Sequence, residues 1–472
     1  MSERGRKPNI VWITMESARS DHTSPGGYER ETTPNLQRIA ERPDGAWFGK
    51  GFASTRWTPA STASILTGTL LSTHTVGIHS PAVNRLPDSL RTMPELLADL
   101  GYTSFGIGNN AYITTGTDLD RGFDRFLDPK PENLHRTVGL GGIFEYVRNI
   151  GTYGPGLSLD KRRHKMAPMT THAVKKWIRS HRSRDDPFFV YIHYNDSHYP
   201  YTPPEHFLEP FADEIGVPPE RIIQHSFDVY ADVFRQVTEG LPLTEEQWDS
   251  IVAAYDAELA FVDHFIGELF DYVQETVPGD TIFVITGDHG EVFGEHGWLG
   301  HHVLYSKELF HVPMVVHGLP EIQHQAENFV QHIDVTRTLA ELAGVESDQF
   351  DGVNLVRDVR EFAAGQRANR ENDRDSLLER DPNFDTSKHR WDAVNCLWDE
   401  EFKLVSGTED EDELFDLPDE TENVIEDFPE VASELRTQLK TYLPRFPETD
   451  ERDPADFSDE AYERLRDMGY IQ

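Results

Sequence analysis

Apolar residues gather in four short runs along the first part of the chain, at 9–15, 102–107, 187–194 and 280–286. Three of these runs are nearly continuous and rich in β-branched and aromatic residues, which is typical of strands buried on both faces of a parallel sheet. Between the runs, apolar residues recur at helical spacing and predict helices at 33–42, 61–67, 93–100, 169–179 and 244–276. Strands that alternate with helices predict an α/β fold, with a central, mostly parallel sheet flanked by helices.

The pattern changes in the last quarter of the chain. Residues 363–389 are highly charged and lose hydrophobic periodicity, so we expect a linker or an exposed insertion there. Residues 390–472 hold short strand-like runs followed by two helical segments. We therefore expect a main domain over 1–362, and a C-terminal antiparallel-sheet subdomain with terminal helices over 390–472.

Charge is strongly unbalanced, because 44 basic side chains stand against 83 acidic ones, for a formal net charge of −39 at pH 7. The sequence has no basic stripe to neutralise phosphates, which argues against nucleic acid and against anionic membrane surfaces as partners. Acidic residues are spread along the whole chain and Arg outnumbers Lys, a composition that suits solubility in concentrated salt. We expect a halophilic source.

Cysteine content and hydropathy bear on the compartment. The single cysteine, Cys396, excludes an intramolecular disulfide and is expected to be a buried thiol. The sequence has no apolar run near the ~18 residues of a membrane span, so no integral membrane segment is predicted. The apolar run at 10–15 is ended by Glu16 and is too short for the core of a signal peptide. We expect a cytoplasmic protein, and the oligomeric state stays open.

Polar residues directly follow two of the predicted buried strands. The first run leads into Glu16, and the fourth leads into Asp288 and His289 on a glycine-flanked turn. Ligands of open α/β sheets lie beyond the carboxyl ends of the strands. Carboxylates together with an imidazole are suitable ligands for a divalent cation. Taken alone, the residues also fit a loop cap at Glu16 and an ordinary turn at Asp288, so both interpretations stay open at this point.

A third candidate is Thr58, in the segment WTPASTASILTG at 57–68. Its hydroxyl stands at the start of a short predicted helix, whose N-terminal amides favour an anion. A hydroxyl bound to a metal loses its proton more easily and becomes a nucleophile. On its own, Thr58 is more typical of an ordinary helix cap than of a nucleophile.

Several ordered blocks of the chain resemble the sulfatase family of the alkaline phosphatase superfamily. The opening block is NIVWITMESARSDH at 9–22, the nucleophile block lies at 57–68, and the histidine block is FFVYIHYNDSHYPYTPP at 188–204. The metal block TGDHGEVFGEHGWLGHH at 286–302 and the C-terminal segments EFKLV and ELFDLPDETEN complete the resemblance. The resemblance implies an alkaline-phosphatase-like α/β sandwich whose catalytic domain spans 1–362.

Carried over residue by residue, the resemblance implies metal ligands at Glu16, Asp288 and His289. It implies that Thr58 is both a metal ligand and the nucleophile, and that His198 binds substrate or serves the leaving group. The cofactor would be one divalent metal ion, and Mn, Mg, Ca and Zn are all compatible with oxygen and imidazole ligands.

Other family positions are less sharply defined. Either His301 or His302 stands where many members place a cation against the substrate's anionic oxygens, and His301 is favoured. Asn109 or Asn110 lies near another such position. The family-typical residues that we expect to support structure rather than catalysis are Arg19, Asp21, His22 and His296.

The nucleophile block departs from the family pattern. Sulfatases convert a Cys or Ser in a C/S-x-P-S-R context to formylglycine, whereas this chain has Thr58 at that position and Thr62 in place of the Arg. Oxidation of a threonine would give a ketone, so we expect no formylglycine. The set Glu, Thr, Asp, His resembles instead the phosphoglycerol transferases and related phosphoesterases of the superfamily, in which an unmodified threonine takes the phosphoryl group.

These observations predict a metal-dependent hydrolase or transferase that acts on phosphate or sulfate esters through Thr58, with a phosphoester favoured. The alternatives are a sulfuric ester hydrolase without formylglycine and a non-catalytic metal- or glycan-binding descendant. A second metal site could be supplied by Asp196, His198 and His301. The substrate would be a small anionic ester, either a glycan or a lipid headgroup, selected by pocket loops at about 128–168 and 204–243.

Overall fold

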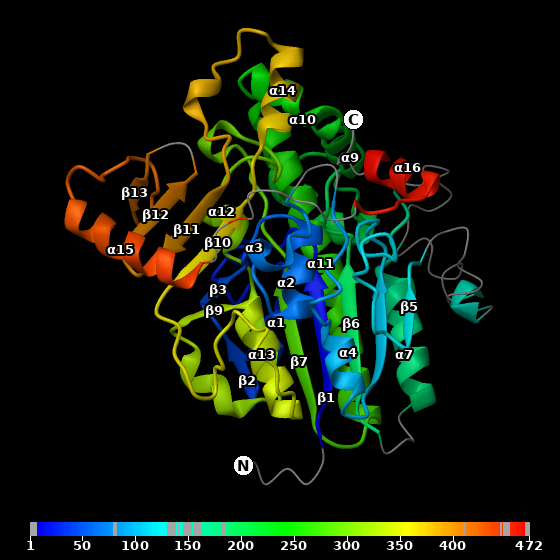
Figure 1. Ribbon diagram of the computed structural model, residues 1–472. Coiled ribbons are helices and arrows are strands. Elements are labelled where there is room, and N and C mark those ends of the chain that lie inside the picture. The colour runs from blue at the N-terminus through cyan, green and yellow to red at the C-terminus, as the bar shows by residue number, and fades with distance from the viewer. Residues whose placement is uncertain are drawn as a thin grey trace.

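Strand β1 (Asn9–Met15) lies at the centre of a seven-stranded sheet, between β6 (Phe188–Tyr194) and β7 (Thr281–Gly287), and pairs with both in parallel (Figure 1). Every residue of these three strands is buried, as their continuous apolar character predicts. The strand order is β2-β8-β7-β1-β6-β4-β5, and β8 runs antiparallel to both of its neighbours. The outer strands are β2 (Gly45–Trp47), β4 (Thr103–Gly108), β5 (Arg125–Leu127) and β8 (Met314–His317).

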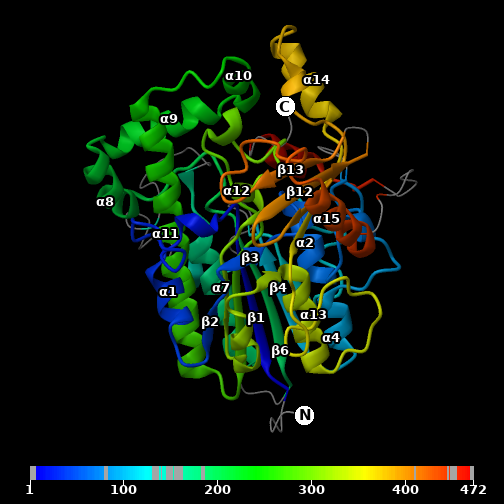
Figure 2. The same ribbon diagram turned by 90° about the vertical axis from the view of Figure 1, so that its left-hand side faces the viewer.

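Helices cover both faces of this sheet, and the predicted α/β architecture is confirmed (Figure 2). Alternate side chains of β1 point to opposite layers: Val11 and Ile13 belong to one hydrophobic cluster, whereas Ile10 and Trp12 belong to the other. The first layer contains α1 (Pro34–Ala40), α7 (Ala167–His181) and α11 (Glu245–Thr276). The second layer contains α2 (Thr58–Thr67), α4 (Met93–Ala98) and α13 (His332–Ala343).

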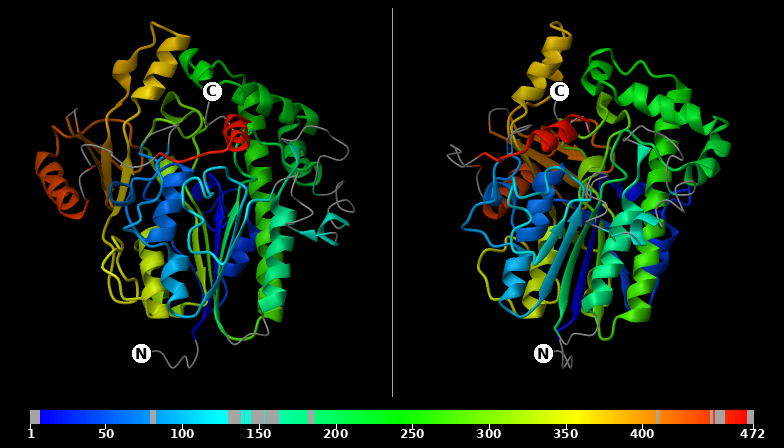
Figure 3. Two further views of the ribbon diagram at one scale, coloured as in Figure 1. Left: turned by 45° about the vertical axis from the view of Figure 1, so that its right-hand side comes forward. Right: turned by 90° about the vertical axis from the view of Figure 1, so that its right-hand side faces the viewer.

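The computed structural model describes residues 7–78, 83–129, 138–139, 141–144, 153, 163–181, 186–408, 411–443, 446 and 454–467. Most of the predicted pocket loop at 128–168 therefore lies outside the described residues. The second predicted pocket loop, at 204–243, is wrong as a loop. It forms three helices, α8 (Glu205–Ile215), α9 (Pro219–Tyr230) and α10 (Val233–Thr238). Helices α8 and α9 pack against α11, whereas α10 packs against α9 (Figure 3).

Helix α2 begins at Thr58, three residues before the predicted start. The extra turn forms because Pro59 occupies the first turn of the helix, where its missing N–H has no intrahelical acceptor to lose. The capping box predicted by Thr244 and Gln247 is present at the start of α11, since each side chain bonds the other residue's backbone amide.

The C-terminal part forms a four-stranded antiparallel sheet, covered by α15 (Pro429–Tyr442) (Figure 1). Its strands are β10 (Ala363–Arg367), β11 (Val394–Trp398), β12 (Phe402–Gly407) and β13 (Glu413–Asp416). Cys396 is buried in β11, as predicted.

The expected linker or insertion at 363–389 begins too early, because residues 363–367 form the fully buried strand β10. Helix α14 (Glu371–Arg380) then lies in the segment between β10 and β11, which pair with each other. The strand has no hydrophobic period because it begins with the small residues Ala363, Ala364 and Gly365 and ends with Gln366 and Arg367. A Cβ at Gly365 would lie 2.6 Å from the ring of Phe310, so close packing there requires glycine.

The remaining elements are short. They are β3 (Lys50–Phe52), β9 (Phe329–Gln331), α3 (Leu71–His74), α12 (Lys307–Phe310) and α16 (Asp459–Asp467). The 3-10 turns lie at Ser20–His22, Glu295–Gly297, Pro320–Gln325 and Thr386–Lys388. Among the helices that the structure describes, none has the length and apolarity to cross a membrane.

Candidate active site

Glu16 occupies the carboxyl end of β1 and is completely buried. The Thr58 hydroxyl donates to Glu16 Oε1, His193 Nε2 lies 2.5 Å from Glu16 Oε2, and Asn110 Nδ2 donates to both oxygens at 3.2 and 3.1 Å. Burial alone would raise the pKa of Glu16, but its interaction with His193, followed by those with His198 and His289, holds that pKa well below its usual value. Glu16 is therefore an ionised carboxylate, and Asn110 is the asparagine of the predicted pair that reaches it.

Asp288 and His289 follow β7 on the neighbouring strand and are also fully buried. Asp288 Oδ1 accepts the amides of Ser17 and His289, both at 2.9 Å. Asp288 Oδ2 accepts no hydrogen bond within the described part of the chain and lies 3.5 Å from His289 Nε2. His289 Nδ1 donates to the Gly290 carbonyl at 2.8 Å, which leaves its Nε2 as the nitrogen facing the site.

These groups form a candidate metal centre. Glu16, His193 and Asp288 each place one ligand atom within 4.8 Å of the others. Burial and the charge of Glu16 raise the pKa of Asp288, because each of two neighbouring carboxylates disfavours the ionisation of the other. The oxygen of Asp288 that accepts no hydrogen bond, together with the mixed oxygen and imidazole donors, fits a divalent ion.

His193 is a member of this centre that the sequence analysis missed. It lies inside β6, in an otherwise apolar strand, and the parallel register places it opposite Thr14 on β1, two residues before Glu16. The signal that could have revealed it is a charged residue type near the carboxyl end of a fully buried strand. The predicted second metal set, Asp196 with His198 and His301, does not form a ligand group among the described residues.

Thr58 is the first residue of the ten-residue helix α2, and its side chain is buried beside the candidate metal ligands. Its Oγ1 donates to Glu16 and lies 3.4 Å from His289 Nε2. Ser61, in the same helical turn, donates to the Asp288 carbonyl at 2.5 Å and ties α2 to the turn after β7. The hydroxyl therefore stands between the ligand groups and a helix N-terminus that favours an anion.

Two histidines complete the polar cluster. The ring of His301 lies 4.6 Å from that of His289 and 5.2 Å from that of His198, measured between centroids. His198 Nδ1 donates to the Tyr199 carbonyl at 2.6 Å, and His301 Nδ1 lies 3.2 Å from a carboxylate oxygen of Glu291. Burial lowers the pKa of both histidines, so both rings are neutral at pH 7.

His302 contacts residues outside the metal-ligand group. Its Nε2 bonds the Tyr199 hydroxyl at 3.0 Å, and its ring packs 4.9 Å from that of Phe234. Among the residues expected to be structural, Arg19 binds Asp21 at 2.7 Å and the Glu291 carbonyl at 3.2 Å. The others contact residues outside the metal-ligand group: His22 binds Asp256 at 2.9 Å, and His296 lies 3.7 Å from Glu308.

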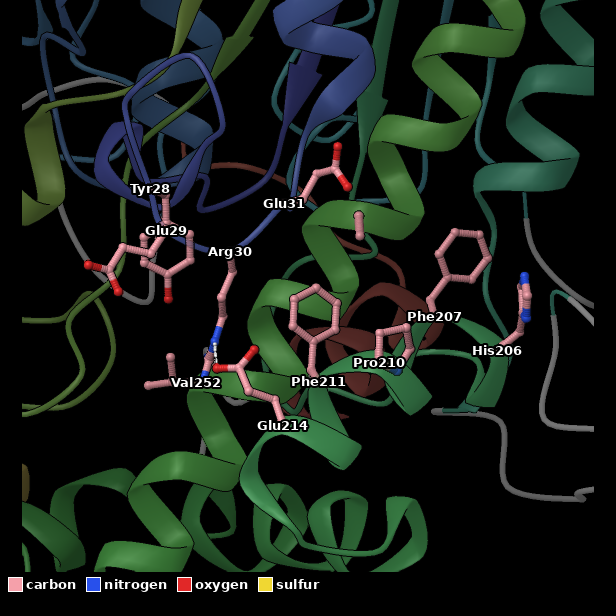
Figure 4. Close-up of a pocket in the computed structure, with 11 residues that line it drawn as sticks. Tyr28, Glu29, Arg30, Glu31, His206, Phe207, Pro210, Phe211, Glu214 and Val252 are labelled. Carbon is pink, nitrogen blue, oxygen red and sulfur yellow. Dashed lines mark hydrogen bonds and ion pairs between the residues drawn. The ribbon is translucent and has the colours of Figure 1, made fainter.

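A cavity of about 940 Å³ opens elsewhere, between the loop at 28–31, α8 and α11 (Figure 4). Arg30 and Glu214 form an ion pair at 2.8 Å on its wall, with the ring of Phe211 beside them. Its lining includes none of the residues of the polar cluster around Thr58. Part of the segment expected to select the substrate, α8, therefore lines a different hollow.

Comparison with known proteins places this geometry in a family. Residues 8–345 match the family model described as sulfatase, and residues 294–446 match the model described as N-sulphoglucosamine sulphohydrolase, C-terminal. The sulfatase YidJ of Escherichia coli (strain K12) is 23% identical over 476 residues, which cover 95% of this chain and 88% of that protein.

Two solved structures are similar in fold. The phosphonate monoester hydrolase of Agrobacterium radiobacter has a TM-score of 0.69 and 21% identity, over 96% of this chain and all of that one. A structure described as BT4656 in complex with its substrate D-glucosamine-2-N,6-O-disulfate has a TM-score of 0.67 and 19% identity, over 92% of this chain and 97% of that one.

Proposed function

Because the chain belongs to the sulfatase family of the alkaline phosphatase superfamily, we propose that it is a metal-dependent ester hydrolase or transferase whose nucleophile is the unmodified Thr58 hydroxyl. We further propose that it prefers phosphoesters to sulfate esters. The observation that carries the proposal is the position of the hydroxyl, which donates to Glu16, lies 3.4 Å from His289 Nε2 and begins α2. A threonine cannot become an aldehyde hydrate, and its direct phosphorylation needs no such group.

Glu16, His193, Asp288 and His289 would hold the divalent ion. When bound, it would lower the pKa of a nearby hydroxyl and offset charge on the ester oxygens. Glu16 supports this assignment because it is ionised and orients the Thr58 hydroxyl. The N-terminal amides of α2 are suited to hold the non-bridging oxygens of the ester.

Two histidines can move the protons. His198 is neutral with Nδ1 donating to Tyr199, so in that tautomer its Nε2 is the basic nitrogen. We propose that it takes the proton as the bond between Thr58 Oγ1 and phosphorus forms. It then returns the proton to the alcohol oxygen as the ester bond breaks. His301, held by Glu291, is the alternative for this role. Water or a second alcohol then attacks phosphorus and gives its proton to His198, which passes the proton to Thr58 Oγ1 as the bond between Oγ1 and phosphorus breaks.

The experiment is a parallel assay of 4-nitrophenyl phosphate, a 4-nitrophenyl phosphodiester and 4-nitrophenyl sulfate, each with Mn²⁺, Mg²⁺, Ca²⁺ and Zn²⁺. We expect turnover of a phosphorus ester with at least one ion, and a phosphorylated Thr58 peptide after rapid quenching. Turnover of the sulfate alone would contradict the phosphoester preference. Metal binding without turnover of any ester would contradict catalysis and favour a non-catalytic binding protein.

A sulfate ester is the second candidate substrate. It is favoured by the similarity to the structure described with D-glucosamine-2-N,6-O-disulfate. The same residues would act on it, but the threonine sulfate would have to be cleared by attack at sulfur. Rapid quenching distinguishes the cases, because a trapped Thr58 sulfate would form only from the sulfate substrate.

A further inference from the structure

Arg56 lies two residues before Thr58, and its charge has no counter-ion in the described part of the chain. Only 2% of the residue is exposed. One guanidinium nitrogen, Nη1, donates to the His301 carbonyl, whereas Nε has no hydrogen-bond partner there. The charges that act on Arg56 are two more arginines, Arg367 and Arg370, against one carboxylate, Asp373. A buried guanidinium in this setting is costly unless an anion reaches it.

The two neighbouring arginines are already engaged. Arg367 donates to the backbone carbonyls of Val303, Arg390 and Asp392 at 2.7, 2.9 and 2.5 Å. Arg370 Nε binds Asp373 at 2.5 Å, so the one nearby carboxylate is held by Arg370 rather than by Arg56. Among the described residues, Arg56 therefore has several N–H donors and a single acceptor, the His301 carbonyl.

The position of Arg56 connects it with the site. Its Cα lies at most about 7 Å from that of Thr58, because two residues of extended chain span no more. Its acceptor, the carbonyl of His301, belongs to the residue whose ring packs against His289. The segment is tied to β10 by the Gln366 amide, which donates to the Ser54 carbonyl at 2.9 Å. The guanidinium therefore lies against the backbone of His301, a residue of the polar cluster around Thr58.

We propose that Arg56, with Arg370 beside it, binds a second anionic group of the substrate. The substrate class is then an ester that carries another carboxylate, sulfate or phosphate close to the ester that reacts. A guanidinium fork matches each of these groups. Although the net charge of the chain is −39, no carboxylate of the described residues forms an ion pair with Arg56. This inference rests on the proposed function at Thr58.

The test compares two aryl esters of the kind that the assay above finds to be turned over, one with and one without a carboxylate on the leaving ring. We expect wild type to prefer the carboxylated ester in kcat/KM, and Arg56→Met to reduce that preference by roughly 10- to 100-fold. An equal fall for both esters, with the preference kept, would overturn the proposal. Replacement of the carboxylate by a sulfonate or a phosphate then identifies which anion is favoured.

Arg367→Met is the matched control, since it removes a buried arginine from the same cluster. We expect it to lower the melting temperature and to leave the preference between the two esters unchanged, because its donors hold backbone carbonyls. Without ligand, Arg56→Met should melt at or above the wild-type temperature, since it removes a buried charge that has no counter-ion. A large loss of stability in Arg56→Met, with the ester preference unchanged, would assign Arg56 a structural role and overturn the proposal.

Binding of esters to an inactive variant tests this inference independently of the proposed function. In the Thr58→Ala protein, the carboxylated ester should raise the melting temperature more than the plain ester, and Arg56→Met in that background should abolish the difference. If no ester is turned over by wild type but this difference is found, the catalytic proposal fails and the anion subsite stands. If turnover occurs without an Arg56-dependent difference, the subsite fails and the catalytic proposal stands.

Discussion

Two clusters of buried charge lie next to each other in this protein, and they have opposite sign. The first contains the carboxylates of Glu16 and Asp288, and one Asp288 oxygen accepts no hydrogen bond among the described residues. The second contains Arg56 and the arginines beside it, with their single carboxylate bound elsewhere. Because isolated buried charge is unfavourable, the carboxylate cluster is suited to bind a cation and the arginine cluster is suited to bind an anion.

A third buried charge, that of Arg360, is neutralised by another residue of the same chain. Arg360 binds both oxygens of Asp334 at 2.6 Å and the Tyr442 hydroxyl at 2.6 Å. This pair serves stability within one chain. The comparison therefore separates charges that the fold neutralises from charges that it leaves for a ligand, and substitutions in the three places should have different effects.

The largest effect is expected from Thr58→Val, which removes the hydroxyl and keeps the side-chain shape. We expect kcat/KM to fall by at least roughly 10³-fold at saturating metal, because the covalent step is lost. Thr62→Val is the matched control, since Thr62 is a buried threonine one turn later in the same helix. Wild-type turnover by Thr58→Val would contradict the assignment of the nucleophile.

The next largest effect concerns the carboxylate cluster. In Asp288→Asn, the side-chain oxygen can still accept the amides of Ser17 and His289, and only the oxygen without a hydrogen bond is replaced. We expect Mn²⁺ affinity, measured by titration calorimetry, to fall by at least about 100-fold. The metal-free variant should melt above metal-free wild type, since one of two adjacent buried carboxylates is gone. Unchanged Mn²⁺ affinity would rule out Asp288 as a ligand.

A smaller effect, on the free energy of unfolding, distinguishes Arg360, which is paired with a carboxylate, from Arg56. Arg360→Met leaves Asp334 buried without its partner, so we expect the free energy of unfolding to fall by roughly 3–5 kcal/mol. Arg56→Met should not reduce it. Urea unfolding of both variants at one salt concentration measures the difference. Equal losses would show that Arg56 stabilises the fold in the same way as Arg360.

The smallest effect is on the pH dependence of stability, through His302. Burial lowers the pKa of His302 to about 4, with Asp373 opposing and with Arg370 and Arg56 adding to the shift. A histidine whose pKa is lower in the folded state contributes stability above its ordinary pKa of ~6.5, and this contribution is lost as the pH falls through about 4.

Melting temperatures between about pH 7 and pH 4 test this expectation. His302→Gln should fall less steeply than wild type over that range, whereas His324→Gln, at an exposed position, should follow wild type. Arg56→Met should make the loss smaller, because removal of a positive charge near His302 brings the pKa of His302 in the folded state closer to its ordinary value. If Arg56→Met leaves the pH profile of wild type unchanged, the two groups are not electrostatically coupled.

Much of this architecture could be predicted from local pattern. Continuous apolar runs identified β1, β6 and β7, and helical spacing identified α11 with its capping box, because burial on both faces or on one stripe leaves a periodic signal. Glu16, Thr58, Asp288 and His289 could be named because each directly follows a strand or begins a helix. His193 was missed, since it is a single polar residue inside an apolar strand.

The amino-acid sequence by itself determined the order of strands and helices and the set of polar residues at the strand ends. Tertiary structure alone decided which of them meet. Parallel register brings His193 beside Glu16, and the packing of small residues makes β10 a buried strand where charge predicted a linker. It also places Arg367 and Arg370 next to Arg56, more than 300 residues earlier in the chain. The physical reason is that such contacts depend on long-range packing, for which no local hydrophobic period exists.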